Sequence, residues 1–491
     1  MKKIKIGLLA VSSLAILSCK KDFLESEPSE WVANPKAEYK LNGLYPMMIN
    51  IGTGGTSGHD DFGQKGYDIF SDILSSDVVL ASSSYGWFRA AANYESTKDY
   101  INTHNYIVWR YYYRLINAAN DVIAGLGGND AAPANESDRH SFGQAKAIRG
   151  YAYFYLLQFY TKEFKPASDA VPLYLEPNSP AKGLAKQSEV YKLIEDDLNQ
   201  AVSLLEGFTR VNKSIIDKNV AKGLLAYVYG AQHKYADVAK LAKDLIENSG
   251  FPITTKEQVV RAKHNGTDFS GGGFNDVTTP SWMWGFDITT ANDFNLRSWW
   301  GQMDIFTYGY AWAGDRKTMD ENLYKSMRDD DVRKGQFGKY GSDNYVPYNK
   351  FFTPERKIGG QRTVVTDYVF MRVDEFHLLA AEALAKTGEE EEAKTILKNY
   401  LKNRLDDVTY IDALSGVALS EEIYKNTRLE FWGEGKSYLA MKRNKASVTR
   451  GANHLFHSGK TFVYNSDELT FDIPQSEIQN NPHITKEELN E

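Results

Sequence analysis

The spacing of apolar residues along the chain predicts a mostly helical protein with one long irregular stretch. From Trp109 onward apolar side chains recur every three or four residues, which is the spacing of one helix face. A glycine pair at residues 127–128 then ends the pattern. Further helices are predicted over residues 142–160, 188–205, 220–230, 235–247, 373–386 and 389–402.

Two of the predicted helical hairpins share a pair of alanines at the same spacing, Ala226 with Ala239 and Ala380 with Ala393. Small residues at facing positions let antiparallel helices approach closely, which is typical of tetratricopeptide-like repeats. No strict repeat period runs through the chain. The pattern therefore predicts a superhelix of degenerate helix pairs with long insertions.

Between residues 251 and 366 the helical spacing fails, and clusters of Gly, Thr and Pro indicate loops and short strands. Long irregular segments in a compact domain tend to carry function. This segment is rich in large aromatic residues: Trp282, Trp284, Trp299, Trp300, Tyr308, Tyr310 and Trp312. A smaller aromatic group, Tyr85, Trp87 and Phe88, lies in an earlier irregular zone beside Arg89 and Asn93.

Composition narrows the class of function. The 491 residues are 42% hydrophobic and 25% charged, as in an ordinary globular protein. With 57 Lys and Arg against 64 Asp and Glu, the net charge is −7, which argues against nucleic acid as a partner. The 31 Tyr, 24 Phe and 9 Trp are many for a chain of mean hydropathy −0.47, so some of these rings are expected to serve recognition.

The beginning of the chain predicts export and lipid attachment. A basic start precedes an apolar run over residues 6–17, which is shorter than the roughly 20 residues that cross a bilayer. Residues 14–18 followed by Cys19, the single cysteine of the chain, resemble a bacterial lipobox. We expect residues 1–18 to be removed as a signal peptide and Cys19 to carry the lipid anchor.

The sequence offers little support for catalysis. It contains no Gly-x-x-x-x-Gly-Lys phosphate loop, no His-Glu-x-x-His zinc motif and no Gly-x-Ser-x-Gly nucleophile elbow. The acidic turns at residues 59–61 and 329–331 leave a structural Ca²⁺ open, although a solvated acidic turn is the better account of each. His454 and His457 lack a third metal ligand nearby in sequence. We therefore predict a protein without catalytic residues and without a required cofactor.

The aromatic residues favour a binding function. Flat rings pack against the apolar faces of sugars while Arg, Asn and Asp bond to hydroxyl groups, and the same side chains also suit a peptide. A surface glycoside hydrolase remains an alternative, since 64 acidic residues offer many carboxylate pairs. A scaffold that binds only a partner protein is the third class, and it requires the central rings to be buried.

Several short motifs, in their order along the chain, resemble the SusD/RagB-like outer-membrane nutrient-binding lipoproteins of Bacteroidetes. The motifs lie at residues 19–25, 42–45, 113–120, 143–154, 171–173, 367–383, 430–435 and 471–482. The chain departs from the family pattern at Asn426-Thr427, Ser437 and Ala440. These departures bear on which subgroup of the family the chain resembles and on local ion pairs. They leave the expected fold unchanged.

The resemblance implies a helical scaffold whose irregular segments form the ligand-binding face. It implies one mature domain, residues 19–491, with an N-terminal helical part (19–250), an aromatic-rich insertion (251–366) and a C-terminal part (367–491). By position, the family's binding regions fall on the two aromatic zones. The predicted ligand-binding residues are Trp87, Arg89, Asn93, Trp300, Tyr310, Trp312 and Asp315.

The resemblance also implies a partner and a location. The expected partner is a SusC-like TonB-dependent transporter, and the expected location is the cell-surface side of the outer membrane. We therefore predict a lipid-anchored protein that binds an oligosaccharide and passes it to that transporter. An oligopeptide, the ligand type of the RagB branch, is the alternative cargo.

Overall fold

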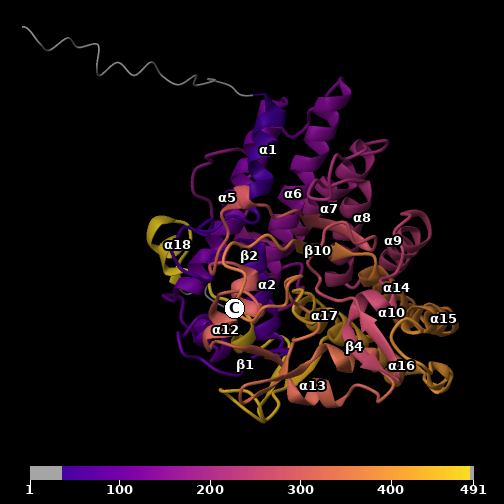
Figure 1. The fold of residues 1–491 in the computed structure, drawn as a ribbon. Helices are drawn as coiled ribbons and strands as arrows, with labels where there is room; N and C mark the ends of the chain where they lie inside the picture. Colours follow the sequence, from indigo (N-terminus) through magenta and orange to yellow (C-terminus); the bar gives the residue numbers. More distant parts are fainter. Residues whose placement is uncertain (1–35, 487–491) are drawn as a thin grey trace, which may run out of the picture.

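The computed structural model describes residues 36–486, so the predicted signal peptide and Cys19 lie outside the described residues. Within this range the protein is mostly helical with small two-stranded sheets, as predicted from the sequence (Figure 1). None of the helices between residues 36 and 486 combines the length and apolar character that a membrane span requires.

The longer helices before the insertion are α1 (Ala37–Met47), α2 (Gln64–Leu74), α5 (Thr103–Gly125), α6 (Glu136–Tyr160), α7 (Gln187–Leu204), α8 (Lys218–Ala231) and α9 (Tyr235–Asn248). Those after it are α14 (Asp374–Thr387), α15 (Glu390–Leu401), α16 (Gly416–Glu430), α17 (Ser437–Asn444) and α18 (Gln475–Asn480). The short helices are α3 (Arg89–Ala92), α4 (Glu95–Lys98), α10 (Lys256–Val259), α11 (Trp299–Met303), α12 (Tyr310–Ala313) and α13 (Glu321–Lys325).

All six sheets of residues 36–486 are antiparallel pairs of short strands. They are β1 (Val78–Leu80) with β7 (Lys317–Met319), β2 (Asp169–Pro172) with β3 (Leu184–Lys186), β4 (Arg261–His264) with β5 (Thr267–Ser270), β6 (Trp282–Phe286) with β10 (Tyr368–Arg372), β8 (Gly338–Tyr340) with β9 (Asp343–Val346), and β11 (Ser447–Thr449) with β12 (Thr461–Val463).

Consecutive helices pack side by side from α5 to α9, and α14 continues the series by packing on α9 (Figure 1). The chain therefore leaves the helical series after α9, forms the insertion and returns to the same place. The alanines shared by the two predicted hairpins, at positions 226, 239, 380 and 393, are all buried. The predicted helix pairs are confirmed.

Two helices begin earlier than their apolar spacing predicts. The side chains of Asn102 and Asn135 accept hydrogen bonds from the backbone amides of His104 and Asp138, so they cap α5 and α6. Such a cap satisfies amides that the first helical turn leaves unbonded. The polar first turns therefore belong to the helices although they lack the apolar stripe.

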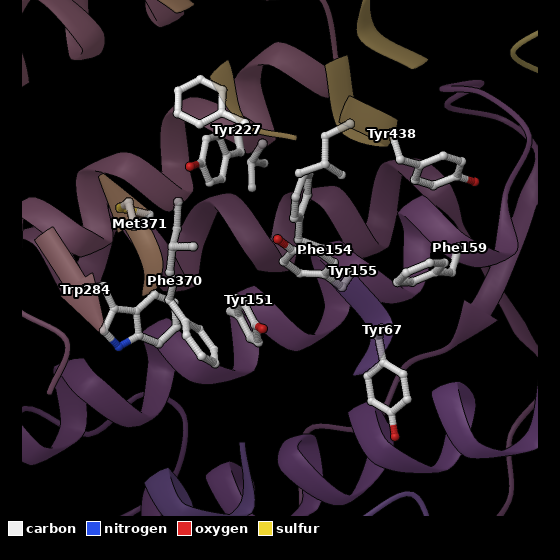
Figure 2. Close-up of a cluster of buried hydrophobic side chains, with 14 of the residues drawn as sticks. Tyr67, Tyr151, Phe154, Tyr155, Phe159, Tyr227, Trp284, Phe370, Met371 and Tyr438 are labelled. Carbon is white, nitrogen blue, oxygen red and sulfur yellow. The ribbon is translucent and has the colours of Figure 1, made fainter. Parts of the chain in front are cut away.

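Aromatic side chains from distant parts of the sequence form the centre of the core (Figure 2). In α6, Tyr151 contacts Trp284 of β6 directly and Phe159 contacts Tyr438 of α17 directly. Tyr67 of α2 is linked to Tyr151 through the ring of Tyr112 in α5. The β6–β10 pair thus attaches the insertion to the helical series. Many of the aromatic residues that stand out in the sequence serve this packing.

A buried ionic network holds the C-terminal helices together. Glu430 of α16 accepts hydrogen bonds from Arg404 at 2.7 Å and from Arg372 at 3.2 Å. Although burial opposes the charged form, these guanidinium groups hold the pKa of Glu430 well below its usual value. Asn426, one of the departures from the family pattern, accepts a hydrogen bond from Arg333 of the same network.

A second buried ion pair joins three N-terminal helices and gives a stability prediction. Arg149 of α6 binds Asp197 of α7 through two hydrogen bonds of 2.7 and 2.8 Å and also donates to Asn120 of α5. We expect Arg149→Met to lower the free energy of unfolding by up to about 3–5 kcal/mol, because Asp197 loses its bidentate partner in the interior and keeps only the 3.2 Å pair with Lys146. Chemical denaturation measures this change.

The matched control is Lys192→Met, which removes the exposed i,i+4 partner of Asp196 on α7. Exposed pairs of this kind contribute little, so the control should unfold like the wild type. Equal stability of Arg149→Met and the control would show that the buried pair does not hold these helices together.

Candidate ligand-binding platform

The β1–β7 pair brings the two aromatic zones of the sequence together. Val78 pairs with Met319 and Leu80 with Lys317, so the segment after β1 runs alongside the segment before β7. The pairing continues beyond the strands, because the amide of Ala81 donates to the carbonyl of Arg316 at 2.9 Å. Residues 82–88 are therefore placed against residues 308–316.

Asp315 joins these two segments directly. Its carboxylate accepts hydrogen bonds from the backbone amides of Tyr85 at 2.7 Å and Trp87 at 3.0 Å. Asp315 is completely buried, so these charge-assisted bonds are shielded from water. Gly314 allows the close approach, since a Cβ at this position would lie 2.3 Å from the Ser84 hydroxyl oxygen.

The result is a cluster of four rings, which we call the aromatic platform: His59, Tyr85, Trp87 and Tyr310. His59 stacks on Trp87 with ring centroids 5.0 Å apart and an angle of 3° between the planes. Tyr310 lies 5.7 Å from Trp87 and 5.4 Å from Tyr85. Tyr85 is 61% exposed and the other three rings are half-buried, so the cluster faces solvent.

Polar contacts orient the rings of the platform. Nδ1 of His59 is hydrogen-bonded to the hydroxyl of Tyr310. Burial, together with the nearby charge of Arg297, lowers the pKa of His59, so the imidazole is neutral at physiological pH. Burial also raises the pKa of Tyr310. The platform therefore presents uncharged rings.

A buried lysine supports the platform from the protein interior. Lys317 donates to Oε1 of Gln302 at 2.6 Å, and the amide nitrogen of Gln302 donates to the carbonyl of His59 at 2.9 Å. Burial lowers the pKa of Lys317 to about 7, an effect that the charges of Asp315 and Asp60 oppose.

The structure brings together Trp87 and Tyr310 of the predicted binding residues. Asp315, predicted to contact the ligand, instead holds the backbone beneath the platform. Trp312 lies two residues from Tyr310 in α12, and side chains two apart do not share a helix face. Trp312 contacts Tyr308 at 5.2 Å, and Arg362 lies over the Tyr308 ring, which gives a separate aromatic patch.

The contacts of the remaining predicted residues are with groups outside the platform. Arg89 is exposed and packs over Phe456, while the backbone carbonyl of Asn93 accepts a hydrogen bond from His457. The prediction that Trp300 offers an exposed ring is wrong, because this residue has no accessible surface. It lies in α11, whose five residues are all buried, so the large apolar indole fills the core.

Sequence reasoning missed His59 as a ring of the platform. This residue stands in a glycine-rich segment, and the acidic residues beside it suggested Ca²⁺ instead. Oxygens of Asp61 accept from the amides of Gly54 and Thr56, and Asp60 pairs with His104. Tyr85 stood out in the sequence as a member of the aromatic group around Trp87, but it was not among the predicted ligand-binding residues.

The carboxylates of the second acidic turn, residues 329–331, also form ion pairs with basic side chains of the protein. Asp329, Asp330 and Asp331 pair with Lys334, Arg328 and Arg333, respectively. Among residues 36–486 no three His, Cys, Asp or Glu side chains are grouped so that they could hold a metal ion. The described part of the chain thus gives no support to the structural Ca²⁺ that the sequence left open.

Comparison with known proteins identifies the family. The family profile described as "SusD family" matches residues 287–489, and one described as "Starch-binding associating with outer membrane" matches residues 38–229. The two matches follow each other and together span most of the chain. The protein belongs to the SusD/RagB family, in agreement with the resemblance of the sequence motifs.

Curated relatives match over part of their length. "SusD-like protein P25" from Formosa agariphila is 28% identical over 183 residues, which cover 35% of this chain and 32% of the relative. A "SusD-like protein" from Bacteroides ovatus is 26% identical over 175 residues, covering 32% of this chain and 30% of the relative. The matched stretch thus spans about a third of each relative.

Solved structures match almost the whole chain. A SusD-like carbohydrate binding protein from Bacteroides vulgatus superposes with a TM-score of 0.76 at 24% identity, covering 92% of this chain and 97% of that one. Surface glycan-binding protein A from Bacteroides thetaiotaomicron gives a TM-score of 0.66 at 16% identity, with coverages of 91% and 97%. These similarities establish the fold.

The lysine beneath the platform gives a prediction about pH. An unfolded lysine titrates near pH 10.4, so between about pH 7 and 10 the unfolded chain holds one more proton at Lys317 than the folded protein. This group therefore makes the folded state more stable as the pH rises through that window, by at most about 1.4 kcal/mol per pH unit. Lys317→Met should reduce the slope of unfolding free energy against pH accordingly.

Urea unfolding at several values between pH 7 and 10 measures both slopes. Lys402→Met, which changes an exposed lysine of the helical part, is the control and should keep the wild-type slope. Identical slopes for Lys317→Met and the wild type would contradict a neutral, buried amine beneath the platform.

Proposed function

We propose that this protein is a cell-surface glycan-binding lipoprotein, in which the aromatic platform captures an oligosaccharide for transport into the cell. The observation that supports this role is the cluster of four solvent-facing rings built from segments far apart in the chain. Rings of this kind pack against the C–H faces of sugars. Their orientation is fixed before binding, which lowers the entropic cost of association.

The wider setting of the proposed function follows from the family. The solved relatives include proteins described as carbohydrate binding and as surface glycan-binding, and one matching family profile is described as starch-binding and associated with the outer membrane. We propose the same location for this chain, with attachment through Cys19. We also propose a SusC-like TonB-dependent transporter as the partner that receives the glycan.

A binding role fits the platform better than hydrolysis. Glycoside hydrolases need two carboxyl groups that face the sugar across the scissile bond. Asp60 and Asp61, which follow His59, and Asp315 beneath the platform are all buried and bonded to protein donors. None of them is placed to act as a general acid or as a nucleophile on a ligand at the platform.

The platform also favours an oligosaccharide over an oligopeptide. A peptide needs partners for its backbone amides and carbonyls and pockets for its side chains. The rings of the platform instead form an apolar surface, and Nδ1 of His59 and the hydroxyl of Tyr310 are bonded to each other. This arrangement suits the flat face of a sugar.

Removing a ring should remove binding. We expect Trp87→Ala to weaken the affinity for a bound glycan at least tenfold, which corresponds to about 1.4 kcal/mol of lost stacking. Tyr310→Phe should have a smaller effect, because the ring stays while its hydrogen bond to His59 is lost. Isothermal titration calorimetry against a panel of neutral oligosaccharides and peptides measures both effects.

Tyr39→Ala is the matched control, since Tyr39 is a 63% exposed tyrosine on α1 and lies outside the platform. It should bind like the wild type. The proposal fails if no glycan of the panel binds, or if a glycan binds Trp87→Ala as tightly as the wild type. Tight binding of a peptide alone would favour the oligopeptide alternative.

A further inference from the structure

A separate groove lies along α5, between this helix, residues 174–179 and α18. Its volume is about 660 Å³, within the range of small-ligand sites, about 300–1,000 Å³. No residue of the aromatic platform lines it. We call it the α5 groove.

The periodicity of α5 gives the groove distinct sides. Residues turn by about 100° around a helix, so Tyr106 and Tyr113 lie almost in line and form the floor. Both residues are half-buried, and the guanidinium of Arg110 lies over the ring of Tyr106. Arg110 and Arg114 stand on one side of this line, and Trp109 stands on the other side.

The two arginines lie against the glycine-rich segment that leads to the platform. Arg114 donates to the carbonyl of Thr53 at 2.8 Å, and Arg110 donates to the hydroxyl of Tyr106. A Cβ on Gly55 would lie 2.6 Å from Nε of Arg110, so glycine makes room for the guanidinium. His59 of the platform follows a few residues later in the same segment.

Both guanidinium groups are exposed, and no Asp or Glu among residues 36–486 forms an ion pair with either. Most buried arginines of this protein have such partners, as Arg149, Arg333, Arg372 and Arg404 show. An arginine presents several N–H donors in a plane that matches a carboxylate. The groove therefore has an unused site for an anionic group.

The opposite side of the groove supplies hydrogen-bond acceptors. Glu477 of α18 accepts from Nε1 of Trp109 at 3.2 Å and from Asn481 at 2.8 Å. Each carboxylate oxygen has two lone pairs, so Glu477 retains capacity to accept from a ligand hydroxyl. The groove thus combines an aromatic floor, cationic donors on one side and acceptors on the other.

We propose that the α5 groove is a second saccharide-binding site, selective for sugars that carry a carboxylate, such as uronic acid residues. The pyranose ring lies on Tyr106 and Tyr113, its carboxylate is bound by Arg110 and Arg114, and its hydroxyl groups donate to Glu477 and neighbouring carbonyls. This assignment shares with the proposed function only the saccharide nature of the ligand. It adds a site and a charge preference that the platform does not provide.

Trigalacturonate and its methyl ester test the proposal by calorimetry on the full mature chain. The wild type should bind trigalacturonate, and the neutral ester should bind at least tenfold more weakly. The double variant Arg110→Gln/Arg114→Gln should lose at least tenfold for the acid and show little change for the ester. Raising the salt concentration should weaken binding of the acid in the wild type.

Two control variants distinguish the α5 groove from the rest of the protein surface. Arg261→Gln removes an exposed arginine outside the groove and should leave binding of trigalacturonate unchanged. Trp87→Ala should also leave it unchanged, so failure of the platform and failure of the groove give different results. Melting curves verify that the double variant is folded, as expected for exposed positions.

Three outcomes would overturn the proposal. The first is that neither trigalacturonate nor an oligomer of guluronate or mannuronate binds the wild type. The second is that the arginine double variant binds the acid as well as the wild type, or that Trp87→Ala alone removes this binding. The third is that a triglutamate peptide binds the groove as tightly as the uronate, which would assign the site to acidic peptides.

Discussion

The aromatic platform depends on the buried carboxylate of Asp315. Residues 82–88 and 308–316 are separated by more than two hundred positions, and neither segment has a long helix or strand of its own. The short β1–β7 pair aligns them, and the two hydrogen bonds from Tyr85 and Trp87 to Asp315 fix the turn that carries the rings. Charge-assisted bonds to a buried carboxylate are stronger than bonds between neutral groups, so they help to order such a turn.

The sequence was sufficient to predict the helical scaffold, because each long helix buries one face of apolar residues against its neighbour. The starts of α5 and α6 were missed, since their first turns are polar and depend on the caps Asn102 and Asn135. Family motifs supplied the order of the elements. The packing of α14 on α9, after the insertion, is a long-range contact. The spacing of apolar residues predicts single helices but not which distant helices pack together.

The binding residues were harder to predict than the fold. Aromatic residues in the irregular zones pointed to the two segments that form the platform. Trp87 and Trp300 nevertheless stand in similar sequence surroundings and occupy opposite environments in the structure. One lies on a turn held at the surface, and the other lies in a short helix that is wholly buried. An acidic residue such as Asp315 can serve the ligand or the backbone, and only its burial and its partners distinguish these roles.

The glycine-rich segment around residues 52–59 links the platform to the α5 groove. On one side it contacts Arg110 and Arg114, and on the other Arg297 and Gln302 bind the carbonyls of Gly58 and His59. The segment that Arg110 and Arg114 contact therefore also carries His59 of the platform. This gives the two surfaces a direct structural connection through the backbone.

Hydrogen–deuterium exchange on the wild type and Asp315→Asn, with and without a bound neutral glycan, tests the central claim most directly. In the wild type the amides of Tyr85 and Trp87 should exchange slowly, and the glycan should protect residues 82–88 and 308–316 further. In Asp315→Asn these amides should exchange faster and the protection by glycan should diminish. Unchanged exchange of these amides in the variant, or protection by the glycan confined to other segments, would contradict the account.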